Sequence, residues 1–165
     1  KEGLEDLNLA LETAAEVLSE AAEEIQKDYA PRLGAKMSRI INAVSGGRYT
    51  ELKADDSLRL KTVMPEIGNI KDAADLSGGT IDQMYFALRV AAAEMIEENG
   101  ETLPLILDEA FAQYDDTRLE RVLSFLGDLA LTRQVILFTC RKREMEAAAQ
   151  MAGGPVNIIK IRNSG

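Results

Sequence analysis

The sequence predicts an α/β protein: a mostly parallel sheet flanked by helices, with a coiled-coil-like helix at the N-terminus. Two observations predict this. From residue 103 onward, apolar strand-like runs alternate with helical patterns, the order in which parallel strands and crossover helices follow one another. The first segment instead repeats apolar residues at alternating steps of three and four. With 165 residues, the chain is long enough for about one domain.

The coiled-coil pattern occupies the N-terminal segment. Its apolar seam consists of Leu4, Leu7, Leu11, Ala14, Leu18, Ala21 and Ile25, and glutamates fill the other face. We therefore assign residues 1–30 to the end of a coiled-coil arm, although three heptads is the shortest run that supports one. An amphipathic helix that packs on its own domain is the alternative. Pro31 is expected to break this helix or to start a new one.

The next part of the chain predicts a helix and two short strands. Apolar residues share one face over residues 32–44, and Gly46-Gly47 ends the helix. Residues 49–53 and 58–63 predict strands, the second of which alternates leucine with basic residues. Residues 65–75 are expected to form a loop.

The rest of the chain predicts alternating helices and strands. Two continuous apolar runs, residues 103–107 and 135–138, are typical of buried strands in a parallel sheet. Helices are expected at residues 80–98, 117–130 and 142–151, and a last strand at residues 156–161.

The composition excludes several kinds of chemistry. The chain contains no histidine, which rules out a Ser-His-Asp triad, a histidine base and histidine metal ligands. Carboxylates are then the main general acid/base candidates. The single cysteine, Cys140, excludes an intrachain disulfide and a cysteine-cluster zinc site.

Charge and hydropathy limit the partners. The net charge of −9 argues against general nucleic-acid affinity. A basic stretch between residues 32 and 61 leaves a small positive patch as the alternative to scattered solvated charges. No stretch approaches the roughly 20 apolar residues of a membrane span, and there is no basic-then-apolar leader. We therefore expect a cytoplasmic protein with no membrane contact.

The first motif, Leu76-Ser77-Gly78-Gly79-Thr80, immediately precedes the strongest helical pattern. Its two glycines let a ligand approach the backbone closely, Ser77 offers a hydroxyl, and the helix directs unsatisfied N–H groups toward the same place. This arrangement is typical of phosphate binding. A plain loop in which Ser77 or Thr80 caps the helix is the alternative.

The second motif, Asp108-Glu109, ends the apolar run at residues 103–107. Ligands in α/β sheets bind beyond the carboxyl ends of strands. An aspartate there can hold Mg²⁺, and the adjacent glutamate can polarise an attacking water. The alternative is a turn or helix start with two exposed acids.

In this order, the two motifs resemble those of the ABC-type ATPase heads of the SMC, RecF and YhaN-like group of coiled-coil DNA-repair ATPases. Leu76-Ser77-Gly78-Gly79 matches the signature motif of that group, and Leu105-Ile106-Leu107-Asp108-Glu109 matches its Walker B strand. Asp115, six residues beyond Glu109, matches the D-loop aspartate. The resemblance covers the C-terminal half of such a head. It implies that residues 31–165 form the C-terminal lobe.

The resemblance implies a mechanism in which two heads enclose two ATP molecules. In each site, the γ-phosphate of the ATP bound to one head would contact the signature residues Ser77, Gly78 and Gly79 of the other head. Asp108 would help to position Mg²⁺, Glu109 would be the general base, and Asp115 would pass the state of one site to the other. ATP would join the heads and its hydrolysis would separate them. The arms would convert this cycle into motion in DNA repair or chromosome maintenance.

The implied partners follow from the same resemblance. They are the N-terminal half of the same ATPase and a second head in a homodimer. A nuclease subunit and DNA are further candidates.

Two features depart from this group. The Gly-x-x-x-x-Gly-Lys-Ser/Thr phosphate loop, which lies in its N-terminal half, is absent, so ATP hydrolysis is expected only when that half is supplied. The switch histidine is also absent. Cys140 most nearly takes its place, and Arg141 could reach a γ-phosphate as a permanent cation. A buried cysteine with no catalytic role is the alternative for Cys140.

Two other functions compete with this hypothesis. One is a non-catalytic coiled-coil interaction module with a degenerate ATPase, which the missing histidine favours. The other is a transporter ATPase subunit, which the heptad arm before the signature motif argues against.

Overall fold

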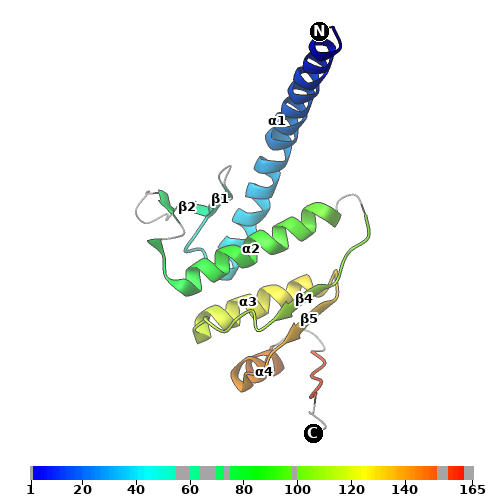
Figure 1. Ribbon diagram of the computed structural model, residues 1–165. Helices are drawn as coiled ribbons and strands as arrows, with labels where there is room; N and C mark the ends of the chain where they lie inside the picture. The colour runs from blue at the N-terminus through cyan, green and yellow to red at the C-terminus, as the bar shows by residue number, and fades with distance from the viewer. Residues whose placement is uncertain are drawn as a thin grey trace.

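The computed structural model describes residues 2–54, 60–63, 70–72, 75–97, 100–151 and 156–161. These residues form a long arm and a mixed α/β body (Figure 1). The elements are α1 (Glu2–Ser45), β1 (Glu51–Ala54), β2 (Leu60–Val63), β3 (Ile70–Asp72), α2 (Gly78–Glu97), β4 (Leu105–Asp108), α3 (Asp116–Leu129), β5 (Val135–Phe138) and α4 (Lys142–Ala149). The three helices expected after residue 75 are confirmed.

α1 is a single helix of 44 residues that runs through Pro31, so the expected break at this residue is wrong. A proline inside a helix removes a backbone hydrogen bond and costs about 3 kcal/mol. An exposed ion pair of 3.0 Å joins Arg32 to Asp28 across the proline and contributes only about 0.3–0.5 kcal/mol. Beyond it, the last turns of α1 are buried in the core, and this packing holds them helical.

The N-terminal part of α1 projects away from the body (Figure 1). Leu7, Leu11 and Leu18 of the apolar seam are 56%, 60% and 70% exposed. These three side chains therefore do not pack on the part of the chain that the structure describes, which argues against the alternative of a helix packed on its own domain. The side chains of Leu4 and Ile25 lie outside the described residues.

The core lies where the C-terminal turns of α1 meet α2 and α3. Its fully buried side chains include Met37, Ile40, Ile41, Val44, Met84, Val90, Leu119 and Val122. Phe111, just after β4, is also fully buried, with its ring centroid 5.9 Å from that of Phe86 in an edge-to-face arrangement. This core holds the base of the arm against the two helices that follow the motifs.

The strands form two small sheets instead of the expected mostly parallel sheet. β1, β2 and β3 are antiparallel, and β4 and β5 form one parallel pair in the register Leu105↔Val135. The short connection between β1 and β2 favours a hairpin, whereas α3 provides the crossover that parallel pairing requires. β3 lies within the expected loop at 65–75, and residues 64–69 and 73–74 lie outside the described part.

The parallel strands are less buried than their apolar sequences predict. Ile106 on β4 and Phe138 on β5 are exposed. Residues 156–161 form no strand, and Ile159 and Ile161 are exposed, so the expected last strand is wrong. Parallel strands are normally covered on both faces. The described residues do not provide that cover. In the described part of the chain, no helix combines the length and apolar character needed to cross a membrane.

Candidate functional site

The signature turn (residues 76–80) forms the N-terminal end of α2. The backbone N–H groups of Thr80 and Ile81 donate to the Ser77 carbonyl at 2.8 and 3.0 Å, and the Ser77 and Thr80 hydroxyls are 2.9 Å apart. Ser77 and Gly78 are exposed. The turn therefore presents a hydroxyl and the positive end of a 20-residue helix to the solvent. An anion could bind there.

Gly79 allows the segment around Asp115 to pack against this turn. A Cβ atom at Gly79 would lie 3.0 Å from the Gln113 carbonyl oxygen and 3.3 Å from Nη1 of Arg118. Both contacts are tighter than side chains normally tolerate. A side chain at Gly79 would therefore require the Gln113 carbonyl and the Arg118 guanidinium to shift by a few tenths of an ångström.

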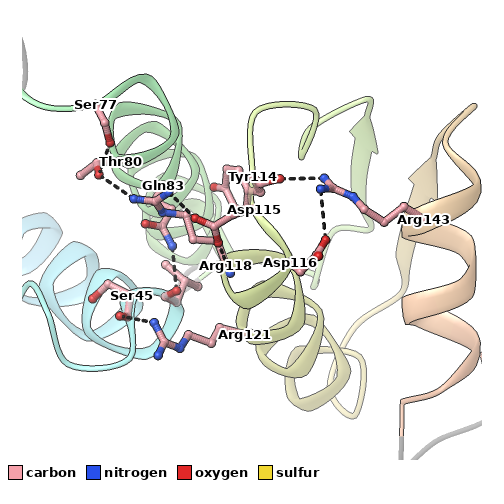
Figure 2. Close-up of polar contacts among 11 residues, drawn as sticks. Ser45, Ser77, Thr80, Gln83, Tyr114, Asp115, Asp116, Arg118, Arg121 and Arg143 are labelled. Atoms are coloured by element: carbon pink, nitrogen blue, oxygen red, sulfur yellow. Dashed lines mark hydrogen bonds and ion pairs between the residues drawn. The ribbon is translucent and has the colours of Figure 1, made fainter.

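Asp115 caps α3 and is joined to the signature turn through Arg118 (Figure 2). The Asp115 carboxylate accepts from the Arg118 backbone N–H at 2.8 Å and from its Nη1 at 2.6 Å. Nη2 of Arg118 donates to the Thr80 hydroxyl at 3.3 Å. The structure thus brings Ser77, Gly79 and Asp115 together. Sequence reasoning missed Arg118, although its spacing three residues after an N-cap aspartate is a usable signal.

Asp108 and Glu109 lie at the carboxyl end of β4, next to the end of β5. Asp108 is exposed. Glu109 has a φ of 46°, a left-handed conformation that is uncommon for residues other than glycine. Its backbone N–H donates to the Phe138 carbonyl at 3.0 Å, and its carboxylate accepts from the Cys140 backbone N–H. The parallel pairing of β4 and β5 therefore brings the two acids beside the segment expected to hold the switch residue.

Cys140 and Arg141 both contact Glu109. Cys140 is exposed, so the alternative of a buried cysteine is wrong. Nε of Arg141 lies 3.6 Å from the Glu109 carboxylate and 4.0 Å from that of Glu144, which is fully buried. Hydrogen bonding to Glu109 raises the pKa of the Cys140 thiol, and burial raises the pKa of Tyr114. Both groups therefore stay protonated at neutral pH.

The signature turn and the strand-end acids form two separate groups. Among the described residues, no hydrogen bond or ion pair joins Ser77 or Gly79 to Asp108 or Glu109. Arg143 on α4 joins this helix to the N-terminal end of α3, because it donates to the Tyr114 carbonyl at 2.7 Å and to Asp116 at 3.3 Å (Figure 2). No cluster of three metal-ligating side chains occurs in the described ranges. The exposed Asp108 carboxylate still fits Mg²⁺, which keeps several of its waters.

The electrostatics of Glu109 predict a pH dependence. The Cys140 backbone N–H bond and the nearby Arg141 cation lower the pKa of Glu109 from its ordinary value of 4.5. We expect ATP hydrolysis by the complete ATPase to show no protonation step of Glu109 between about pH 5 and 8. The measurement is kcat as a function of pH. In Arg141→Met, which removes the cation, any acid limb should move to higher pH. An acid limb near pH 6 that Arg141→Met leaves in place would contradict this assignment.

The comparison with family models identifies the motif region. A model described as SbcC/RAD50-like, Walker B motif, matches residues 57–128. This interval contains the signature turn, the acids at the end of β4 and the N-cap of α3. The Walker B motif indicates a group of proteins that hydrolyse ATP.

Two curated proteins are similar to the chain. The uncharacterized protein YhaN of Bacillus subtilis (strain 168) is 33% identical over 143 residues, which cover 84% of this chain and 14% of YhaN. The chromosome partition protein Smc of Xanthomonas oryzae pv. oryzae is 28% identical over 165 residues, which cover 92% of this chain and 14% of Smc. The chain therefore spans 14% of the length of each of these relatives.

Solved structures share the fold. One, from work on ATP-driven dimerization and DNA stimulated activation of SMC ATPases, has a TM-score of 0.65 at 18% identity and covers 86% of this chain and 84% of its own. Another is the Smc head domain with an extended coiled coil, bound to the C-terminal domain of ScpA, from Pyrococcus furiosus. It has a TM-score of 0.56 at 21% identity and covers 88% of this chain and 39% of its own.

The fold and the two motifs define the C-terminal part of an ATPase head of the SMC/RAD50-like class. More particularly, the chain is homologous to YhaN and to SMC head domains, and it carries an SbcC/RAD50-like Walker B region. It corresponds to the C-terminal lobe of such a head.

Proposed function

We propose that two copies of this lobe, each completed by its N-terminal half, enclose ATP between them and hydrolyse it. The observation that carries this proposal is the separation of the two motifs. The signature turn is open to solvent, and its contacts are with the D-loop segment instead of the acids at the end of β4. In a dimer, the signature turn of one copy would face the acids at the end of β4 of the other copy.

In this proposal each residue has a role that its position supports. Ser77, Gly78 and Gly79 bind the γ-phosphate held by the opposite head. The carboxylate of Asp108 helps to hold Mg²⁺, which would neutralise phosphate charge. Glu109 accepts a proton from the attacking water. Asp115 passes the state of one site to the other. Arg141 acts as the cation that senses the γ-phosphate in place of the missing histidine, beside Cys140.

The same proposal names the partners. The N-terminal half would cover the apolar side chains exposed on β4, on β5 and at residues 156–161. Residues 1–30 would continue a coiled-coil arm through the exposed seam of α1. Two similar structures support a role in chromosome maintenance or DNA repair: an Smc head bound to ScpA, and an SMC ATPase studied for DNA stimulated activation. We therefore include DNA or a nuclease subunit as a further partner.

Mixing two inactive variants tests whether the signature turn acts across the dimer. Ser77→Arg blocks the turn, and Glu109→Gln removes the base, so each complete ATPase alone should hydrolyse little ATP. A mixed dimer contains one intact site. An equal mixture should therefore recover about one quarter of the wild-type rate, because half of randomly formed dimers are mixed and each has one working site of two.

The control is each variant alone at the same total concentration, for which the ATPase rate should not recover. If the mixture of the two variants stays as inactive as either variant while dimers still form, the shared site is contradicted.

A further inference from the structure

A buried carboxylate on α4 has no hydrogen bond that accounts for its burial. Glu144 lies in the first turn of α4 and is the one buried side chain of that helix. Both of its carboxylate oxygens are buried, and neither accepts a hydrogen bond from any residue that the structure describes. Burying a carboxylate charge without hydrogen bonds is costly, so such a group calls for a nearby cation.

The cation beside this carboxylate is the guanidinium of Arg141, three residues earlier. Nε of Arg141 lies 4.0 Å from Oε1 of Glu144 and 3.6 Å from Oε2 of Glu109. Both distances exceed the length of a direct N–H···O bond, which is about 2.7–3.2 Å. Within the described part of the chain, no other cation forms an ion pair with Glu144. One guanidinium therefore stands between two carboxylates and can move toward either.

The two carboxylates attract this guanidinium from different surroundings. The side chain of Glu144 is 0% exposed, whereas that of Glu109 is 39% exposed. A charge acts more strongly where water is excluded, because the dielectric constant there is lower. The attraction of Glu144 for Arg141 therefore opposes that of Glu109.

Without the charge of Glu144, the guanidinium would close onto Glu109. Arginine and a carboxylate form a strong, two-bond ion pair when nothing holds them apart. Such a pair would occupy the carboxylate oxygens that have to accept a proton from water. It would also withdraw the guanidinium from any phosphate at the strand ends.

We propose that Glu144 is a positioning residue, which holds the Arg141 guanidinium off Glu109 and keeps it available to the γ-phosphate. This inference rests on the proposed function, in which Glu109 is the base and Arg141 senses the γ-phosphate. Because Glu144 is buried, it acts through Arg141 and not by touching the nucleotide. Its contribution is a fixed negative charge behind the sensor.

Glu144→Gln in the complete ATPase tests this role, since glutamine keeps the size of the side chain and removes its charge. We expect kcat to fall about tenfold, within the range of coupling between residues in contact. The affinity for a non-hydrolysable ATP analogue should fall, while the affinity for ADP stays unchanged, because ADP has no γ-phosphate. Steady-state assays and equilibrium binding measure these values. Glu146→Gln is the matched control: this exposed glutamate of α4 pairs with Lys142 at 3.3 Å, and its loss should change none of them.

The Arg141→Met background separates positioning from a structural role. If Glu144 acts through Arg141, Glu144→Gln should cause no further loss of kcat or of affinity for the ATP analogue in this background. A loss of the same factor in both backgrounds would overturn the proposal. So would an unchanged kcat in Glu144→Gln alone, or an equal fall in the affinities for the ATP analogue and ADP.

Glu144→Leu is a second variant, for which the same results are expected. It leaves no buried charge unpaired, because the side chain of Arg141 is 47% exposed. If Glu144→Gln and Glu144→Leu both unfold the lobe, Glu144 is a structural residue and the proposal is overturned. A complete wild-type ATPase that hydrolyses no ATP would instead contradict the proposed function.

Discussion

Glu109→Gln in the complete ATPase is expected to lower kcat by about 10²- to 10⁴-fold, the contribution typical of a positioned general base. The reason is local. Glu109 is held at the end of β4 by the Cys140 backbone N–H, and its lowered pKa keeps it ionised and able to accept a proton. Glutamine preserves the size of the side chain but accepts no proton. Nucleotide binding should survive, so ATP-held dimers should accumulate.

Steady-state ATPase assays and size-exclusion chromatography with ATP measure the two effects. Glu120→Gln is the matched control, because this glutamate is exposed on α3 away from the strand ends, and its rate should equal that of wild type. Equal and negligible rates in wild type and Glu109→Gln would contradict the enzyme hypothesis. That result would instead support the alternative hypothesis of a non-catalytic interaction module.

Glu97→Ala should lower the free energy of unfolding of this chain by about 3 kcal/mol, the lower end of the cost of breaking a buried ion pair. Glu97, at the end of α2, forms a two-contact ion pair with Arg133, which precedes β5, and one of these contacts is 2.9 Å. The side chains of Glu97 and Arg133 are only 10% and 6% exposed. Glu97 also accepts from the Leu103 backbone N–H at 3.0 Å. Its loss would leave a buried guanidinium without a counter-charge.

Urea denaturation followed by circular dichroism measures this change. Glu101→Ala removes an exposed glutamate nearby and should change the stability by less than about 0.5 kcal/mol. The double variant Glu97→Met/Arg133→Met should recover much of the loss, because it leaves no unpaired charge. If Glu97→Ala lowers the free energy of unfolding no more than Glu101→Ala does, solvent already screens the ion pair between Glu97 and Arg133, and the prediction is contradicted.

The local sequence pattern was sufficient to predict the helices and strands whose ends depend on residues nearby in the chain. The helix at residues 78–97 and the strand at 135–138 lie within two residues of their expected positions, because their periodicity and flanking residues act within a few turns. The parallel pairing of β4 with β5 was also predictable, since the helix between them permits no hairpin. The exposure of Ser77 and Asp108 agrees with the roles inferred from their motifs, while those roles stay predictions.

Local pattern failed where a distant contact decided the outcome. Pro31 predicted a break, but the core beyond it holds α1 in one helix. Residues 156–161 have the composition of a strand and find no strand to pair with among the described residues. Arg121 and Gln83 have no special spacing that marks them as bonded to the base of the arm, and the spacing of Arg118 from Asp115 does not reveal its bond to Thr80.

The sequence by itself therefore determined the order α2, β4, α3, β5 and α4, the two motifs and the class of ATPase to which they point. These depend on the type of each residue and of its near neighbours along the chain. Only the tertiary structure decided that Glu109 meets Cys140 and Arg141, and that two arginines on α3 join the signature turn to the arm. Those contacts join segments up to 76 positions apart. Which side chains meet at such separations depends on how the core packs, and no local pattern records this.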